Sequence, residues 1–573
     1  MERAEQQQRP DTAPRELVRP GRAGAGIATA LFLIVLANWS LHLQPTRYTS
    51  DFYDVQARRL FHGHLSVPLD RIGLEAFHHG NAYHLYFGIF PTLLRMPILL
   101  LTSRFDGRLT QPSMLAAWAV LLIAVRGLLW HTRLLVRGDL SSRPLDGVDR
   151  LMSFATPIVL VAATPVLFLA SVTAVYHEAI LWGLAATLWT FHRLLLVLNE
   201  PSRKAVLVFG LGATVAMTSR ASVGLAPCAS AIVVAVVALA SNRTPGGSRW
   251  RHATARLRDA IGCGMLSTRN ARLVLLAALV PIGIHVAVNE ARFGTTISPP
   301  YASQVWTDIS ADRRAALAAN GGSLFNVGYA PSTMLAYLRP DGAQLSRQFP
   351  YLWFDRPARV VGDVVFDTRD RTASLTSVSP LLVALSGAGA VIVAHAVIRG
   401  RRVARLALPA ITSIGATVGV LTIGFIAQRY EGDLLLPALL LALPACLVVL
   451  DALFAPRIHR RLSTAASIAL VVAVAWSMWA NVSIAVLYQR LYVPSRDADR
   501  HRFIDLQLTM QSIAPGSIGY ERGDDAPTGV APARHLHVTG DCRELWWSDG
   551  TIWIQLEPLA SGQSPLCQRL VSQ

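Results

Sequence analysis

The chain has 573 residues, of which 52% are hydrophobic and only 16% are charged. This composition is too apolar for a soluble globular protein of that size, so it indicates an integral membrane protein. The formal net charge of +17 would suggest nucleic-acid binding in a soluble protein, but here the arginines fall in short clusters between apolar runs. Charges that orient membrane helices are distributed in that way, and we therefore expect no nucleic-acid partner.

The chain begins with a polar, arginine-rich tail that ends at Arg22, and an apolar run follows it. This run, Ala23–Leu43, is longer than a signal-peptide core and lacks a convincing cleavage site, so we interpret it as a retained first helix. About 20 apolar residues cross the hydrocarbon layer. On that measure the sequence predicts about eleven spans, near residues 24–43, 112–132, 151–171, 179–198, 204–219, 222–241, 272–289, 377–398, 407–426, 433–451 and 464–488.

Arginine clusters predict the orientation of these spans. They occupy the N-terminal tail and the connections near 133–150, 203–204, 243–258, 399–405 and 457–461. These are alternate connections, so all of them can be cytoplasmic together, as the excess of arginine and lysine on that side requires. We expect a multi-pass protein of the inner (plasma) membrane with a cytoplasmic N-terminus and an extracytoplasmic C-terminus.

One apolar segment, Tyr86–Leu101, does not fit as a span. Counting it would place the arginines of residues 133–150 outside, and the segment is short and carries Pro91, Arg95 and Pro97. We expect an amphipathic or re-entrant piece at the outer interface.

Three regions are then extracytoplasmic: loops at 45–111 and 290–376, and the tail. The sequence predicts two units, a membrane domain of residues 1–489 and a small β-rich domain of residues 490–573. Long loops between helix ends suggest a site at the outer surface of the membrane.

The first loop opens with two acids, Asp51 and Asp54, which would lie one turn apart on a short interfacial helix. A carboxylate at the boundary between lipid and water could deprotonate a hydroxyl, because partial desolvation raises its basicity. Alternatively, Ser50 and Asp51 could cap the first amides of that helix.

Asp51 precedes, and Asp54 lies within, a pattern Tyr-x-x-x-Ala-x-x-Leu-x-x-Gly. This pattern resembles the first loop of the GT-C superfamily of membrane glycosyltransferases, here of an actinobacterial type. Many relatives carry an Asp-Glu pair three or four residues before the tyrosine, whereas Thr49 and Ser50 stand there in this chain, so both aspartates remain candidates. The pieces that carry the resemblance are Tyr53, Ala57, Leu60 and Gly63, then 80–88, 90–97, 289–294, 428–430 and Asp433.

The resemblance implies transfer of a sugar from a polyprenyl-phosphate donor to a cell-envelope glycan or glycolipid acceptor, usually with inversion. Asp51 or Asp54 would take the acceptor's proton. Arg220, Arg292 and Arg429 would bind the lipid phosphate, since each falls at an outer helix end and arginine binds phosphate through a planar fork. Each arginine could instead snorkel to the interface or pair with an acid, as Arg429 could with Glu431 or Asp433.

Further substrate contacts are expected from Tyr53, His177, Glu178, Asn289 and Tyr430. Glu178 could position an acceptor hydroxyl or replace the aspartate as base, and capping of its loop is an equal alternative. The first loop also holds five histidines: His62, His64, His78, His79 and His84. They lack the spacing of a rigid metal site, so we assign no metal ligand. A divalent metal ion is the one cofactor that we consider.

In the tail, residues 535–538 and 544–556 alternate as short strands do, with Asp549-Gly550 as a hairpin turn. Cys542 and Cys567 would form a disulfide in an oxidising compartment. Three tryptophans there (Trp546, Trp547 and Trp553) could stack on sugar rings or form the core of the sheet.

Two other functions remain open. A transporter or flippase of a lipid-linked sugar would need the same loops and arginines but no base, and it should show charged residues deep within helices and paired broken segments. A noncatalytic membrane protein that binds cell-wall glycan through its tail would not depend on the first loop.

Overall fold

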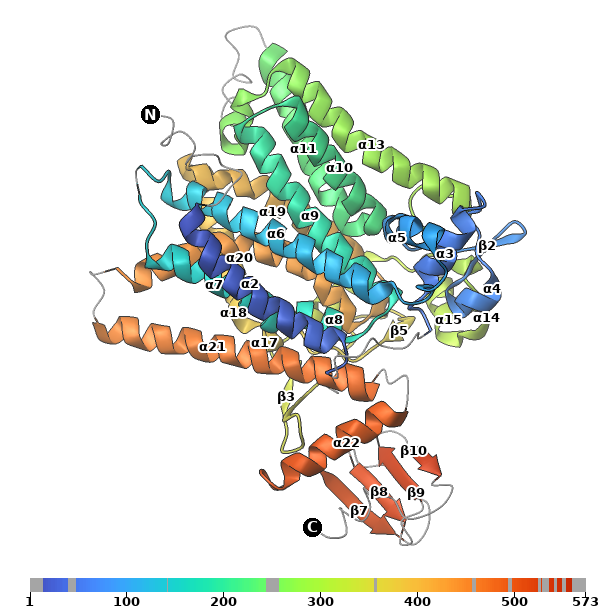
Figure 1. The fold of residues 1–573 in the computed structure, drawn as a ribbon. Helices are drawn as coiled ribbons and strands as arrows, with labels where there is room; N and C mark the ends of the chain where they lie inside the picture. The colour runs from blue at the N-terminus through green and yellow to red at the C-terminus, as the bar shows by residue number, and fades with distance from the viewer. Residues whose placement is uncertain are drawn as a thin grey trace.

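A computed structural model describes residues 14–39, 48–141, 143–243, 257–354, 358–455, 460–492, 497–523, 527, 535–539, 544–548 and 553–558. Figure 1 shows a bundle of long helices with a smaller unit of one helix and a sheet next to it. The largest cluster of buried apolar side chains extends from the bundle into this unit, where it includes Leu508, Leu536 and Trp547.

Each segment predicted as a span contains a helix within its described residues. Nine helical segments within the described residues are long and apolar enough to cross a membrane. They correspond to α2 (Arg15–Leu36), α6 (Thr110–Arg137), α9 (Val175–Asn199), α11 (Ala221–Arg243), α13 (Thr268–Phe293), α18 (Pro380–Arg399), α19 (Ala407–Leu421, with the 3-10 turn Arg402–Leu406 before it), α20 (Glu431–Leu453) and α21 (Arg460–Leu487).

The other two predicted spans are shorter. α10 (Arg203–Ser219) has 17 residues, and the segment near 151–171 is divided into α7 (Gly147–Ala162) and α8 (Val166–Ser171). The division lies beside Pro165, which has no N–H to donate and disfavours helical backbone in the residue before it. The protein is therefore mostly helical and multi-pass, and the prediction of about eleven spans corresponds to nine long helical segments and two shorter ones in the described part of the chain.

Glycine allows close approach at two helix crossings. A Cβ at Gly24 of α2 would lie 2.0 Å from the carbonyl oxygen of Phe154 on α7. A Cβ at Gly389 of α18 would lie 1.8 Å from the carbonyl oxygen of Leu441 on α20. Small residues let membrane helices pack backbone against backbone in this way.

We call the end of the bundle at the right of Figure 1 the loop end, because the first loop and the second-loop helices of residues 305–319 lie there. The helix expected to stay out of the membrane, α5, has 12 residues and is too short to span it. The elements of the two loops are α3 (Phe52–Leu60), α4 (Leu69–Ile72), β1 (Phe77–His79), β2 (Ala82–His84), α5 (Phe90–Leu101), α14 (Val305–Ile309), α15 (Ala311–Ala319), α16 (Ala330–Leu338), β3 (Gln344–Leu345), β4 (Leu352–Trp353), β5 (Thr368–Arg369) and α17 (Leu375–Val378).

Short strand pairs hold these loops together. β1 pairs with β2 and β3 with β4, both antiparallel, whereas β5 runs parallel to β6 (Phe425–Ile426) just before α20. The first loop is also joined to the second, because Phe77 forms an isolated bridge with Gln304. The two loops thus form one layer over the helix ends.

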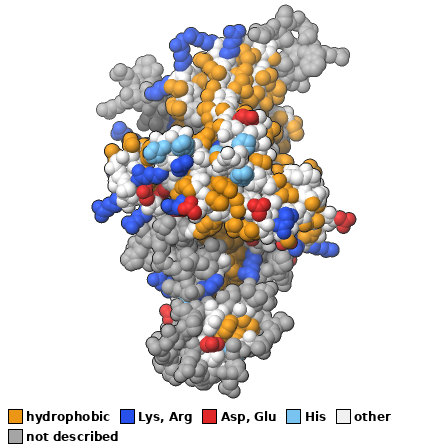
Figure 2. Space-filling view, turned by 90° about the vertical axis from the view of Figure 1, so that its right-hand side faces the viewer, with side chains coloured by type: hydrophobic (Ala, Val, Ile, Leu, Met, Phe, Trp, Pro, Cys, Tyr) orange, Lys and Arg blue, Asp and Glu red, His pale blue; other side chains and the backbone are white. Residues whose placement is uncertain are grey.

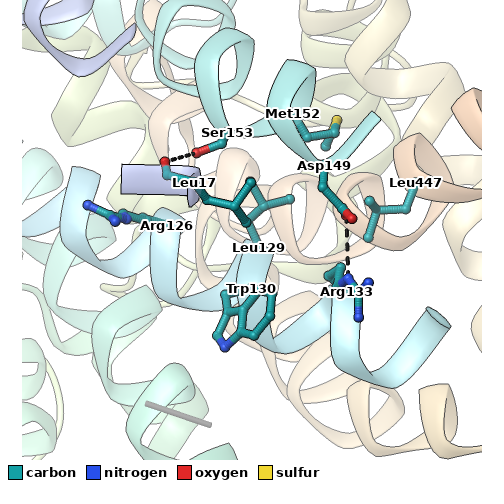
Figure 3. Close-up of a pocket in the computed structure, with 9 residues that line it drawn as sticks. All are labelled: Leu17, Arg126, Leu129, Trp130, Arg133, Asp149, Met152, Ser153 and Leu447. Atoms are coloured by element: carbon teal, nitrogen blue, oxygen red, sulfur yellow. Dashed lines mark hydrogen bonds and ion pairs between the residues drawn. The ribbon is translucent and has the colours of Figure 1, made fainter. Parts of the chain in front are cut away.

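The opposite end, at the left of Figure 1, we call the arginine end. Arg137 of α6 donates to Asp149 of α7 at 2.7 Å and to Asp451 of α20 at 3.1 Å, and its side chain is fully buried. Figure 3 shows the neighbouring pair of Arg133 and Asp149, together with Ser153, whose hydroxyl donates to Leu17 of α2. Several partners for each charge fix the three helices to one another.

The C-terminal unit contains α22 (Asp497–Gln511) and a sheet ordered β10-β9-β8-β7. β7 (Gly519–Gly523) and β8 (His535–Thr539) are parallel, and β9 (Glu544–Ser548) and β10 (Trp553–Pro558) form the predicted antiparallel hairpin. Trp547 is buried in the core of the sheet, which agrees with one of the two alternatives given for the three tryptophans. The turn residues and both cysteines of the predicted disulfide, Cys542 and Cys567, lie outside the described residues.

The predicted boundary between residues 489 and 490 falls inside a π-helical turn, Tyr488–Tyr492, that continues α21. The sequence did not predict α22. This helix contacts the second loop, since Gln507 donates to the carbonyl oxygen of Phe349 at 3.2 Å and the ring of Phe503 lies 6.1 Å from that of Phe349. The C-terminal unit therefore contacts the loop layer directly.

Candidate active site

Arg95 is the centre of a buried ion-pair network at the loop end. It lies on α5, where Leu100 and Leu101 are 71% and 85% exposed, as suits a helix at a membrane surface. Its Nε donates to Asp54 at 2.5 Å, and its terminal nitrogens donate to both oxygens of Glu178 at 2.7 and 2.8 Å. All three charged side chains are at most 3% exposed, so one guanidinium joins α3, α5 and α9.

Asp54 and Glu178 have their oxygens occupied. The second oxygen of Asp54 accepts a hydrogen bond from the Gly107 N–H at 2.7 Å, and Glu178 accepts another from the Ser113 hydroxyl. Burial raises the pKa of Asp54 above its ordinary value, although Arg95 opposes the shift. Both carboxylates are held by a buried guanidinium and are closed off from solvent, with side-chain exposures of 3% and 0%. The geometry thus gives a structural role to two residues for which the sequence predicted catalytic or substrate contacts.

Asp51 differs from Asp54, although the two are three residues apart. It stands at the N-cap position of α3, yet its side chain makes no capping hydrogen bond, so the expectation that this carboxylate caps the helix is wrong. One oxygen accepts from Arg71 at 2.8 Å, and the side chains of Asp51 and Arg71 are 14% and 54% exposed. Asp51 is therefore the accessible member of the predicted pair.

Arg292 ends α13 as a buried guanidinium with an incomplete set of partners. It is 2% exposed, and its Nη1 donates to the carbonyl oxygen of Phe87 at 2.8 Å. Its Nε and Nη2 are buried and find no acceptor among the described residues, and the buried Tyr53 hydroxyl and His84 Nδ1 also have no partner there. Most buried donors in proteins are paired, so this group of unpaired atoms requires an explanation.

Arg220 follows α10 and has a complete partner. Its Nε and Nη2 donate to the two oxygens of Asp433 on α20 at 2.6 and 2.5 Å. Gly183 on α9 makes room for it, because a Cβ there would lie 2.8 Å from the Arg220 Cβ. The sequence offered Asp433 as a partner of Arg429, but the structure pairs it with Arg220. Glu431, the other acid named with Arg429, instead accepts from Gln428 at 2.8 Å.

Arg429 is surrounded by aromatic rings. Its guanidinium carbon lies 4.7 Å from the ring centroid of Tyr176, 5.0 Å from that of Phe425 and 5.2 Å from that of Tyr430. Its acidic neighbour, Asp370, is 3.9 Å away, and the Arg429 side chain keeps 19% of its surface exposed. Cation–π contacts on several sides hold the guanidinium without using up its N–H groups.

Glu75 belongs to this group and was not predicted. It is the last residue of a 3-10 turn in the first loop. Its carboxylate accepts a hydrogen bond from the Tyr176 hydroxyl and a longer one, of 3.3 Å, from the Gln304 amide. Among the described residues no ion pair joins it to a basic side chain. Burial raises its pKa above the ordinary value, while the bond from Tyr176 and the nearby Arg429 act in the opposite direction. The one signal in the sequence is an acid between two apolar residues, Leu74 and Ala76.

Phe87 connects the Arg292 group to the Glu75 group. Its carbonyl oxygen accepts from Arg292, and its ring centroid lies 6.3 Å from that of Tyr53 and 5.2 Å from that of Tyr176. The next residue, Gly88, abuts α10, since a Cβ there would lie 2.2 Å from the carbonyl oxygen of Thr218. The two groups are thus adjacent parts of one region.

Two other predicted contacts serve local structure. The ring of His177 is buried against Phe168 at 5.0 Å, and its Nδ1 is 3.1 Å from the carbonyl oxygen of Leu169. The Asn289 amide donates to the carbonyl oxygen of Ile297 at 3.1 Å, which ties the second loop to the end of α13. Tyr53 and Tyr430, by contrast, lie beside Arg292 and Arg220 respectively, and their substrate contacts stay a prediction.

Figure 2 looks at the loop end, where basic, acidic and histidine side chains form a band among hydrophobic ones. Within the described residues no three His, Cys, Asp or Glu side chains are placed to hold a metal ion. The candidate acids do not converge, because Asp54 and Glu178 both bind Arg95 while Asp51 binds Arg71. Among the described residues, these acids therefore do not share one donor set for a divalent cation.

No model of a protein family matches the chain, and no curated protein matches it. Among solved structures it is similar to the oligosaccharyltransferase of Archaeoglobus fulgidus in its apo form, with 13% identity and a TM-score of 0.44 over 87% of this chain and 58% of that one. The archaeal enzyme AglB with an inhibitory peptide and a dolichol-phosphate gives 12% identity and a TM-score of 0.45 over the same shares. A complex of the archaeal enzyme with Zn and sulfate gives 12% and 0.42, over 86% and 56%.

The chain spans less than two thirds of the length of these enzymes. At TM-scores below 0.5, the function has to be argued from this chain's own residues.

Proposed function

We propose that the protein is a membrane glycosyltransferase that moves a sugar from a polyprenyl-phosphate donor to a cell-envelope glycan or lipid acceptor, at a site on the loop end. The loop end would face the extracytoplasmic side, because the clustered arginines lie at the other end. One observation carries this proposal. Arg292 is buried at the end of a membrane helix with two of its N–H-bearing nitrogens unpaired.

A buried charge without a partner is strongly unfavourable, and each unsatisfied donor costs about 1–3 kcal/mol. A phosphate group would remove both penalties, because its oxygens accept the paired N–H groups of a guanidinium. The Tyr53 hydroxyl, also unpaired beside Arg292, could donate to the same group. Arg292 is therefore the best candidate for the phosphate site among the three arginines that the sequence named.

A lipid-linked phosphate suits this position better than a free one. Arg292 lies in the last turn of α13, and it contacts Phe87, which is three residues before α5, a helix whose exposed leucines suit contact with lipid. A polyprenyl chain in the bilayer would present its phosphate at the depth of these helix ends. Arg429 keeps part of its guanidinium exposed for a second oxygen, whereas Arg220 is already bound by Asp433.

The reaction needs a base and a stabilised leaving group. Asp51 would take the proton of the acceptor hydroxyl as its oxygen bonds to the anomeric carbon. The bond from that carbon to the phosphate oxygen would break, and the electron pair would leave with polyprenyl phosphate. Arg292 would stabilise the negative charge on the departing phosphate. Attack opposite to the leaving group inverts the anomeric configuration.

The test is sugar transfer from radiolabelled polyprenyl-phosphate sugars to a cell-envelope acceptor fraction, using the full chain in lipid. We expect transfer by the wild type and a loss of about 10²–10³-fold in Arg292→Gln, the size found when one donor to developing charge is removed. Arg104→Gln is the matched control, because Arg104 is an exposed arginine at the same end. No donor consumption by the wild type, or equal rates in both variants, would contradict the proposal and favour a transporter.

A further inference from the structure

Among the residues that the structure describes, Glu75 is a carboxylate without an ion pair in a region rich in charge. Its two oxygens accept from a phenol and an amide, both neutral, through Tyr176 and Gln304. Gln304 is itself held by Arg313, which donates to Asp367 at 3.0 and 2.6 Å. The carboxylate of this first-loop residue is thus fixed by α9 and by the second loop, and it remains partly exposed.

Three tyrosines face the same region with unused hydroxyls. Tyr86 lies within electrostatic range of Glu75, Tyr301 and Tyr430. No hydrogen bond joins the hydroxyl of any of the three to another described residue, and each side chain is partly exposed. Their rings belong to one aromatic group, in which Phe77 lies 5.3 Å from Tyr86 and 5.8 Å from Tyr301.

A carboxylate, a guanidinium and tyrosines of this kind are complementary to a sugar ring. The ring presents hydroxyls, which can donate to the carboxylate and accept from the guanidinium, and apolar C–H faces, which pack on aromatic rings. Each Glu75 oxygen accepts one of these hydrogen bonds and can accept a second, because a carboxylate oxygen carries two lone pairs.

The position of this group relative to Arg292 indicates which sugar would bind. Phe87 contacts Arg292 through its carbonyl oxygen and Tyr176 through its ring, and Tyr176 bonds to Glu75. A sugar attached to a phosphate on Arg292 would therefore lie next to Glu75.

We propose that Glu75, Arg429 and the tyrosines around them (Tyr86, Tyr176, Tyr301 and Tyr430) form the subsite that binds the sugar of the donor, with Glu75 accepting a hydrogen bond from a ring hydroxyl. This inference rests on the proposed function, since it places a lipid phosphate on Arg292. It adds a specificity-determining carboxylate that is separate from Asp51.

The experiment measures equilibrium binding to the full chain in lipid nanodiscs. The probes are polyprenyl phosphate without a sugar and the mannose, glucose and arabinose derivatives of the same lipid. We expect the wild type to bind at least one sugar derivative ten times more tightly, or more, than the bare lipid phosphate. Glu75→Gln should lose that preference while it binds the bare lipid as the wild type does. Arg292→Gln should weaken both classes of probe together.

Glu290→Gln is the matched control, because Glu290 is an exposed glutamate at the loop end. If Glu75→Gln does not fold, as thermal unfolding would show, Tyr176→Phe is the second variant. It keeps the carboxylate but removes the hydroxyl that orients it, and a reduced preference is expected.

The outcomes separate the two proposals. Binding of bare polyprenyl phosphate without any preference for a sugar, or full preference in Glu75→Gln, would overturn the subsite and leave the phosphate site standing. No binding of any probe by the wild type would overturn both.

Discussion

The two ends of the bundle use buried arginine in opposite ways. At the arginine end, Arg137 is fully buried and shared among three aspartates from α7 and α20 and the connection before α7. At the loop end, Arg292 is equally buried, but its protein partner is one carbonyl oxygen and two of its nitrogens remain unpaired among the described residues. An arginine whose N–H groups all have acceptors stabilises the fold. A buried arginine with unpaired N–H groups marks a position where a ligand would supply the missing acceptors.

The same difference separates neighbouring acids at the loop end. Asp54 is bound by Arg95 and a backbone N–H, whereas Asp51 and Glu75 keep exposed surface. Burial behind an ion pair therefore distinguishes the structural Asp54 from the candidate site residues Asp51 and Glu75 more sharply than position in the sequence does. Four predictions test that distinction.

The largest effect is expected at Asp51. Asp51→Asn should lower sugar transfer by about 10²–10⁴-fold, because a general base contributes that much, and leave the melting temperature unchanged. Asp54→Asn should instead lower the melting temperature, since Arg95 loses one of its two buried acids. Transfer rates and thermal unfolding of both variants in the same lipid provide the comparison. If Asp51→Asn transfers as well as the wild type, Asp51 is not the base.

At the arginine end, Arg137→Met should destabilise the protein by about 3–5 kcal/mol, because it leaves buried aspartates without their cation. Thermal unfolding measures this effect, and donor binding by the remaining folded protein should not change. Arg399→Met, an exposed arginine on the last turn of α18, is the control and should melt as the wild type does. Equal melting of both variants would show that the network contributes little.

Arg292→Met should change the stability of the folded protein in the opposite direction to Arg137→Met. Removing a buried, incompletely paired guanidinium relieves its desolvation, so we expect a gain of about 1–3 kcal/mol in stability in the absence of ligand. The same variant should lose binding of polyprenyl phosphate. A fall in melting temperature like that of Arg137→Met would mean that Arg292 is a structural residue.

The smallest effect concerns pH. Burial raises the pKa of Glu75 in the folded state above its ordinary value. At pH values just above the ordinary pKa of a glutamate, Glu75 is therefore protonated in the folded protein and ionised in the unfolded chain. Glu75 therefore favours folding at low pH, and this contribution is lost as the pH rises through the folded-state pKa.

Glu75→Gln, which cannot ionise, should be more stable than the wild type at neutral pH, and the difference should shrink as the pH falls. Thermal unfolding of both proteins across that range measures it. A difference that does not depend on pH would show that the Glu75 pKa is not raised by folding.

Several site residues could be predicted because their signals are local. Arg292 and Tyr53 were named from helix-end position and from a short motif, and the structure places them together with unpaired atoms. Glu75 was missed because an isolated acid in a loop has no periodicity or spacing to mark it. Asp54 and Glu178 were named for catalysis because their common partner, Arg95, was considered only as a reason against a membrane span.

The sequence by itself determined that this is a multi-pass membrane protein with two long loops and a β-containing tail. Hydropathy, arginine clustering and strand alternation are properties of consecutive residues, so they can be found along the chain. The tertiary structure alone decided which charged side chains have buried partners of opposite charge. Arg95 meets Glu178 across 83 residues and Arg137 meets Asp451 across 314, and such distances in space are set by how the helices pack.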